Sequence, residues 1–140
     1  MVSQQPDMFA EPGPSAPPGL LYRPDFLSLD EEQALADWLA DLPFQPFQFR
    51  GFEGRRRVVS FGWKYAFNRS SLQKVDDIPA QLLPVRARAA EFAGLRAFDL
   101  QQVVLNEYLP GVPVGWRRDR PMFAEIVGIS LLNSCVFRFR

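Results

Sequence analysis

The residues Asn106-Glu107-Tyr108-Leu109-Pro110-Gly111, with Gly115-Trp116-Arg117-Arg118-Asp119-Arg120-Pro121 after them, carry the strongest structural signal in this chain. The β-branched and aliphatic residues of 100–108 predict a strand, and Pro followed by Gly at 109–111 predicts a turn at its end. Segments 125–132 and 135–140 predict two further strands. The last third of the chain is therefore expected to form a sheet.

The first hundred residues predict two helices that pack on the rest. Ser28 followed by Glu31 has the spacing of a capping box, and apolar residues recur at helical intervals until Pro43. A second helix is predicted from Pro79, which suits a first helical position, to Gly94, which suits a C-terminal cap. Residues 58–67 between the helices predict a strand, because they are rich in β-branched and aromatic residues. Residues 1–19, rich in proline, are expected to form a disordered tail.

Composition excludes several classes of protein. The chain has 140 residues with 16 Lys and Arg against 16 Asp and Glu, so any contact with nucleic acid needs a local basic patch. No apolar run reaches the ~18 residues of a membrane span, and the N-terminus lacks the pattern of a secretory signal. We therefore expect a cytoplasmic protein that makes no membrane contact. The single cysteine, Cys135, excludes an internal disulfide.

The absence of histidine restricts the chemistry most. Imidazole is the usual general base and the commonest metal ligand at neutral pH. Ser-His-Asp and Cys-His catalysis and histidine-ligated iron or zinc are therefore excluded, unless another residue stands in. The carboxylates Asp99, Glu107 and Glu125 show no pairing signal and are expected to be solvated.

Four segments together resemble the AlkB family of iron(II)/2-oxoglutarate dioxygenases. These are the two quoted above, Val127-Gly128-Ile129-Ser130-Leu131-Leu132, and Phe137-Arg138-Phe139-Arg140. The family carries Asn-x-Tyr-x-x-Gly, a His-x-Asp metal motif that follows Gly-Trp in one branch, and a Val-Gly-x-Ser-Leu strand that leads to Phe-Arg. The resemblance implies an α+β fold with the double-stranded β-helix, or jelly-roll, of these oxygenases.

The same resemblance sets the expected domain organisation. Residues 20–98 would form an N-terminal extension with the two helices and strands like the family's nucleotide lid, and residues 99–140 would form the first part of the jelly-roll core. We expect that core to be incomplete, because the family's distal strands, second histidine and C-terminal arginine would lie beyond Arg140. An alternating, half-apolar strand is also an unusual place for a domain to end.

The resemblance implies Fe(II) and 2-oxoglutarate as cofactors. Asn106 and Tyr108 would hydrogen-bond 2-oxoglutarate from one strand; the alternative is a polar patch on a sheet. Asp119 is the only ligand position that is kept, because Arg117 occupies the position of the first histidine. A guanidinium stays protonated and offers no lone pair to a metal. We expect Arg117 to pair with Asp119 in place of the metal and the chain to be catalytically inactive.

The substrate implied by the resemblance is an alkylated base of DNA or RNA, which would be dealkylated by oxidation. Trp63, Tyr65 and Arg57 are the candidate substrate contacts, because arginine and aromatic side chains combine phosphate attraction with base stacking. The alternative for residues 55–57 is a solvated sheet edge. In the tail, Gln5-Pro6-Asp7-Met8-Phe9 resembles the short peptide by which repair proteins bind the sliding clamp.

Three interpretations follow. The chain is an inactive AlkB-like dioxygenase, a noncatalytic remnant that binds nucleic acid or a repair complex, or a degraded product without stable function. Salt-dependent binding of DNA without turnover of 2-oxoglutarate would favour the second. Low solubility caused by exposed apolar sheet faces would favour the third.

Overall fold

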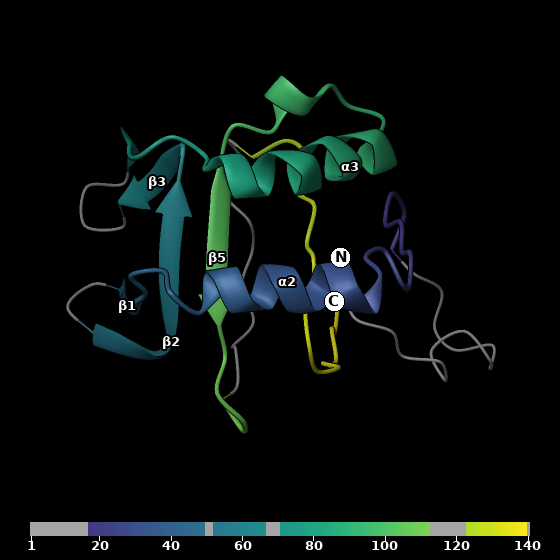
Figure 1. Cartoon of the computed structure of the whole chain (residues 1–140). Helices are drawn as coiled ribbons and strands as arrows, with labels where there is room; N and C mark the ends of the chain where they lie inside the picture. Colours follow the sequence, from purple (N-terminus) through teal and green to yellow (C-terminus); the bar gives the residue numbers. More distant parts are fainter. Residues whose placement is uncertain (1–16, 50–51, 67–70, 113–122, 140) are drawn as a thin grey trace. The chain divides into compact units, whose positions relative to one another are not determined.

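The computed structural model describes residues 17–49, 52–66, 71–112 and 123–139 (Figure 1). The chain divides into two compact units, one formed by residues 1–41 and 122–140 and the other by residues 42–121. The elements in chain order are α2 (Leu29–Leu39), β1 (Gln45–Phe49), β2 (Phe52–Phe61), β3 (Trp63–Ala66), β4 (Ser71–Lys74), η1 (Ala80–Leu82), α3 (Leu83–Ala93), η2 (Ala97–Asp99) and β5 (Val103–Glu107). Helices and antiparallel strands are mixed, in agreement with the expected α+β class.

Helix α2 belongs to the first unit and begins at the predicted capping box. The Ser28 hydroxyl accepts a hydrogen bond from the Glu31 backbone N–H at 3.1 Å, and the Glu31 carboxylate accepts one from the Ser28 backbone N–H at 3.0 Å. These bonds satisfy two donors that a helix N-terminus otherwise leaves unpaired. The helix ends at Leu39, before the predicted stop at Pro43.

The second unit contains a three-stranded antiparallel sheet in the order β1-β2-β5. Val58 and Asn106 are cross-strand neighbours, as are Arg57 and Glu107, and the register of β2 against β5 is regular. The register of β1 against β2 shifts between Pro46 and Gln48. Strands from both sides of residue 98 thus share one sheet. The expected boundaries at residues 19 and 98 stay a prediction, and residues 1–16 of the tail lie outside the described residues.

Gly62 divides the predicted 58–67 strand into β2 and β3. Its φ is +78°, a conformation that residues with a Cβ rarely adopt. Its backbone N–H donates to the Asp76 carbonyl at 2.6 Å, and its own carbonyl accepts from the Val75 N–H at 3.2 Å. Strand β3 then turns away from the sheet and pairs with β4 as a separate two-stranded hairpin.

The second predicted helix is present as η1 followed directly by α3. Gly94 ends α3 with a φ of 71° and is confirmed as the C-terminal cap. Pro79 is the extended N-cap residue of η1, one position before the first helical residue that was predicted. The Leu95 N–H returns to the Ala90 carbonyl at 2.8 Å beyond that cap. Among the described residues of this unit, the buried side chains are Phe61, Leu82, Ala89 and Ala90.

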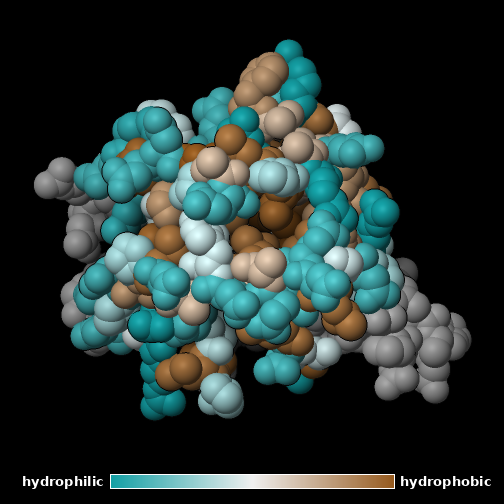
Figure 2. Space-filling model, viewed as in Figure 1, coloured by the Kyte–Doolittle hydropathy of each residue, from teal (hydrophilic) through white to brown (hydrophobic). Residues whose placement is uncertain are grey.

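The strands predicted at 125–132 and 135–140 are wrong for the described residues, because 123–139 contains no strand. A strand needs a hydrogen-bonded neighbour, and no described segment pairs with this one. Its large apolar side chains Ile126, Leu132, Val136, Phe137 and Phe139 are exposed. In Figure 2, apolar residues likewise reach the surface among hydrophilic ones. The jelly-roll therefore stays a prediction. No helix among the described residues is both long and apolar enough to span a membrane.

Candidate functional site

The predicted metal-ligand positions Arg117 and Asp119 lie outside the described residues. The turn that leads toward them is described: the Val112 N–H donates to the Leu109 carbonyl at 3.1 Å, and Gly111 has a φ of +79°. Proline at the second position and a positive φ at the third are typical of a type II turn, so the predicted turn is confirmed.

The donor set of this chain does not fit ferrous iron as the family holds it. Among the residues that the structure describes, no three His, Cys, Asp or Glu side chains come close enough to share a metal ion. The facial site of these oxygenases takes two imidazoles and one carboxylate, and the sequence contains no imidazole. We therefore assign no chemistry to a bound iron.

Asn106 and Tyr108, the residues implied for 2-oxoglutarate, lie at the end of β5. Asn106 is exposed and stands opposite Val58 of β2. It shares its side of the strand with Val104, because side chains two apart on a strand point the same way. Tyr108 follows the last residue of β5 and is 45% exposed. Both side chains are thus accessible, which is compatible with a polar ligand and with a polar patch on the sheet.

Arg57 is held on the opposite side of the sheet from Asn106. Its Nε donates to Glu107 Oε1 at 2.7 Å and its Nη2 donates to Oε2 at 2.8 Å, which is a bidentate pair. The guanidinium also lies 5.6 Å from the Phe44 ring centroid. Glu107, expected to be a solvated carboxylate without a partner, neutralises this arginine instead. The pair joins residues 50 apart in sequence, so only the strand register reveals it.

The other two arginines of β2 form no ion pair with a described residue. Arg55 is exposed. The guanidinium of Arg56 stacks on Phe47 of β1, with 4.0 Å from Cζ to the ring centroid. A basic residue stacked on an aromatic ring keeps its charge while its stem is covered. The local positive charge predicted for this strand therefore rests on Arg55 and Arg56 more than on Arg57.

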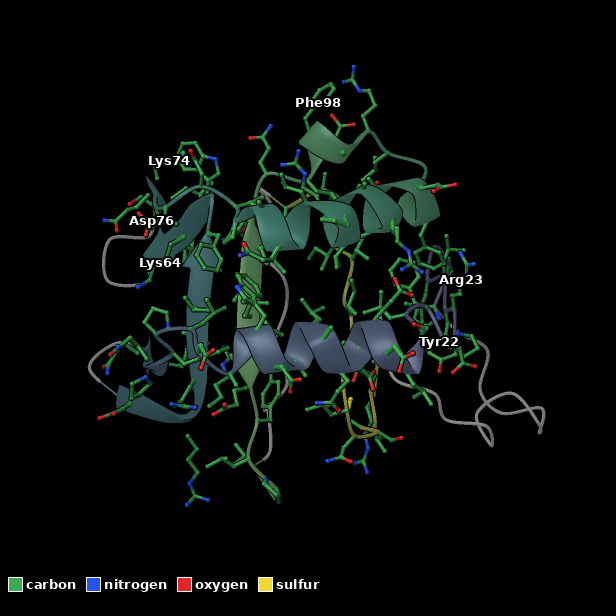
Figure 3. All side chains as sticks on the ribbon, in the orientation of Figure 1. Tyr22, Arg23, Lys64, Lys74, Asp76 and Phe98 are labelled. Atoms are coloured by element: carbon green, nitrogen blue, oxygen red, sulfur yellow. The ribbon has the colours of Figure 1, made fainter. Side chains whose placement is uncertain are left out.

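The β3–β4 hairpin places aromatic and basic side chains together. Trp63 stands opposite Lys74, and Tyr65 stands opposite Leu72. Trp63 and Tyr65 are two residues apart, so they share one side of the hairpin, and both are partly exposed. The Lys74 Nζ lies 5.9 Å from the Trp63 ring centroid. Lys64 is exposed on the other side, and Figure 3 shows it at the same hairpin as Lys74.

Lys74 was not among the predicted site residues. It donates to Asp77 Oδ1 at 2.9 Å and to the Val75 carbonyl at 3.0 Å. That hydrogen bond, with the lysine charge, holds the pKa of the Asp77 carboxyl below its ordinary value. Its position beside Trp63 depends on the hairpin register, which the sequence does not show before β4 is known. A basic residue about ten positions after an aromatic one is the only local signal that could have suggested it.

Known proteins resemble this chain over most of its length. It is 28% identical over 134 residues to the alkylated DNA repair protein ALKBH8 homolog of Arabidopsis thaliana, with 88% of this chain covered. It is 29% identical over 132 residues, 89% of the chain, to the tRNA (carboxymethyluridine(34)-5-O)-methyltransferase ALKBH8 of Mus musculus. The Xenopus tropicalis protein of the same name is 26% identical over 135 residues, 91% of the chain. These relatives confirm the predicted resemblance to the AlkB family.

The chain spans 36% of the Arabidopsis relative and 20% and 21% of the mouse and frog relatives. The Arabidopsis relative is named for repair of alkylated DNA, and the mouse and frog relatives are named for methyl transfer to tRNA. These names refer to different reactions, but each reaction has a nucleic acid as its substrate. No protein-family profile and no solved structure matches the chain significantly.

Proposed function

Because the chain resembles AlkB homologues over most of its length, we propose that it is an AlkB-like nucleic-acid-binding protein that does not itself carry out iron-dependent oxidation. The observation that carries the proposal is the hairpin that brings Trp63, Tyr65 and Lys74 together in a chain without histidine. The relatives support it, because their names all point to nucleic acids while the reactions differ.

The hairpin suits unpaired bases better than a duplex. An aromatic face stacks on any base, and a neighbouring cation attracts the phosphate that follows it. Trp63 offers such a face, and Lys74 lies beside it, where a phosphate would share the lysine with the exposed Asp77 carboxylate. Lys64, exposed on the other side of β3, adds a second cation to the same hairpin. Since the whole chain carries no net charge, this local patch has to supply the attraction.

Arg57 contributes less to the proposed binding than its sequence position suggests. Its guanidinium is engaged by both carboxylate oxygens of Glu107. A phosphate at Arg57 would have to replace two hydrogen bonds to one carboxylate, whereas at Lys74 it would replace one, to the almost fully exposed Asp77 carboxylate. We therefore assign the binding energy to the hairpin and treat Arg57 as a residue that fixes β2 against β5.

The absent oxidation follows from the donor set. A protein with a carboxylate and an arginine at two of the ligand positions lacks the neutral nitrogen donors that ferrous iron takes in these enzymes. In the proposal, Arg117 pairs with Asp119. Asn106 and Tyr108 then remain as polar side chains at the end of β5, and 2-oxoglutarate turnover is not expected.

Fluorescence anisotropy with a labelled single-stranded oligonucleotide tests the proposal. The double variant Trp63→Ala/Lys74→Ala should weaken binding by about tenfold or more, because stacking of one base alone contributes roughly 1–3 kcal/mol. The matched control is Arg96→Ala/Phe98→Ala, which removes another aromatic residue and the cation 4.2 Å above its ring. Phe98 is 56% exposed on η2 and lies well apart from the hairpin in Figure 3.

The control should bind like the unaltered chain. Equal losses in the two double variants would show that binding does not reside on the hairpin, and a wild-type chain that binds no oligonucleotide at low salt would contradict the proposal altogether. Circular dichroism of each variant checks that the fold is retained.

A further inference from the structure

Two carboxylates follow β4 directly and accompany the lysines of the β3–β4 hairpin. Among the described residues of the hairpin, Lys64 and Lys74 are the cations, and Asp76 and Asp77 lie two and three positions after Lys74. All four side chains are exposed. The attraction that the hairpin exerts on a phosphate therefore depends on which of these charges are already paired with one another.

Lys74 is paired with Asp77 and not with Asp76. Its Nζ donates to Asp77 Oδ1 at 2.9 Å and to the Val75 carbonyl at 3.0 Å, which uses two of the three N–H donors of the ammonium group. The side chain of Asp76 forms no ion pair with a described residue. The two neighbouring carboxylates thus differ in their relation to the same lysine.

Backbone hydrogen bonds fix the segment that leads to Asp77. The Gly62 N–H donates to the Asp76 carbonyl at 2.6 Å, and the Val75 N–H donates to the Gly62 carbonyl at 3.2 Å. Because Gly62 directly precedes Trp63, these bonds hold the segment at the end of the hairpin where Trp63 and Lys74 are cross-strand neighbours. The position of Asp77 beside Lys74 is therefore part of the fold.

An ionised carboxylate at this distance offsets the attraction of Lys74 for a phosphate. The hydrogen bond from Lys74, with the lysine charge, holds the pKa of the Asp77 carboxyl below its ordinary value, so the group is ionised at neutral pH. Each phosphate of a single strand that a protein cation neutralises steepens the dependence of log K on log salt by about 0.7. A lysine that is already neutralised by Asp77 contributes less of that slope.

We propose that Asp77 is an internal counterion of Lys74, which limits both the affinity of the hairpin for single-stranded nucleic acid and the salt dependence of that binding. Asp77 acts through Lys74 and is not assigned a contact with a base or a phosphate. The inference rests on the nucleic-acid binding proposed above and adds a residue that restrains it.

Fluorescence anisotropy of the full chain with a short labelled oligothymidylate, repeated at several salt concentrations, tests the inference. Asp77→Asn should bind about two- to fivefold more tightly than the wild type at low salt, the range expected for an exposed ion pair. Its salt dependence should be steeper by up to about 0.7 in the slope of log K against log salt. Because the Asp77 side chain is 94% exposed, the substitution should leave the fold intact, and circular dichroism checks this.

Asp76→Asn is the matched control, because it removes the same charge from the adjacent residue, which Figure 3 shows at the same hairpin. It should tighten binding less than Asp77→Asn and leave the slope nearly unchanged. A second control places both Asp77→Asn and Asp77 in a Lys74→Gln background. There the Asp77 substitution should have little effect, because the lysine through which it acts is gone.

The outcomes separate this inference from the function on which it rests. Equal gains from Asp77→Asn and Asp76→Asn, an unchanged slope in Asp77→Asn, or a gain that persists in the Lys74→Gln background would overturn the inference while the wild type still binds. If neither the wild type nor Asp77→Asn binds the oligonucleotide at low salt, the proposed function fails and the inference fails with it. Binding by Asp77→Asn that is lost on Lys74→Gln would support the inference even if the wild type bound too weakly to measure.

Discussion

Gly62 is the single residue that separates the sheet from the hairpin. A Cβ added there would overlap the Gln101 backbone carbonyl, and the φ of +78° is already unfavourable for any other residue. Gly62→Ala should lower the free energy of unfolding by about 1–3 kcal/mol. The added Cβ would clash with the Gln101 backbone, and relieving the clash would require the backbone at Gly62 or at Gln101 to shift. Urea denaturation followed by circular dichroism measures the loss.

Gly94 provides the matched control for this prediction. Its φ of +71° is similar, but a Cβ at Gly94 would meet nothing within 4 Å. Gly94→Ala should therefore cost less than Gly62→Ala, since it adds backbone strain without a steric clash. Equal losses at the two positions would show that the close approach of Gln101 does not matter.

Ser28 tests the capping box at the start of α2. Ser28→Ala removes the acceptor of the Glu31 N–H and should lower stability by about 0.5–2 kcal/mol. Asparagine is as good an N-cap residue as serine, so Ser28→Asn should retain most of the stability. Thermal or urea unfolding of both variants makes the comparison. If Ser28→Asn lost as much stability as Ser28→Ala, the Ser28 hydroxyl would contribute through packing and not through its hydrogen bond to the Glu31 N–H.

At the scale of elements, the sequence predicts what is encoded locally. The capping residues of α2, the C-terminal cap Gly94 and the Pro110-Gly111 turn each act within a few residues, and the structure confirms all three. Pro79 lies one position before the helix that it was predicted to begin. Of the predicted strand 100–108, residues Val103–Glu107 form β5, because its β-branched residues have a paired neighbour in β2.

Features that depend on pairing between distant segments could not be predicted from the sequence. The break at Gly62 depends on Gln101, and the ion pair of Arg57 depends on Glu107, 50 residues away. The segment 123–139 shows the converse, because it has strand-like residues without a described partner and forms no strand. Composition predicts the capacity to pair, whereas pairing itself is decided by the neighbours that are available.

The candidate site likewise has a part that could be predicted locally and a part that depends on strand pairing. Trp63 and Tyr65 could be identified from sequence as aromatic residues of a strand near arginines, and the hairpin places them on one side. The cation beside Trp63 proved to be Lys74, which the register of β4 brings there. The arginine nearest in sequence, Arg57, is instead directed to Glu107. The role of Trp63 and Tyr65 in stacking stays a prediction, and the charged neighbours of these residues could not be predicted without the strand register.

At the scale of the whole molecule, the chain combines a resemblance to AlkB homologues with a sequence that contains no histidine. It matches relatives over about nine tenths of its length and spans 20% to 36% of theirs. The proposed nucleic-acid binding rests on the hairpin of one unit, 42–121, whereas the family's oxidation uses two imidazoles and the given sequence contains none. The two properties can therefore be separated by experiment in one sample.

The most direct measurement combines a labelled N-methylated oligonucleotide, Fe(II) and 2-oxoglutarate with the wild-type chain and with Arg117→His, and follows anisotropy and formaldehyde release together. We predict that both proteins bind the oligonucleotide and that neither releases formaldehyde above a sample without protein, because a single restored histidine still leaves one imidazole missing. Formaldehyde released by either protein, or oligonucleotide left unbound by the wild type, would contradict the account.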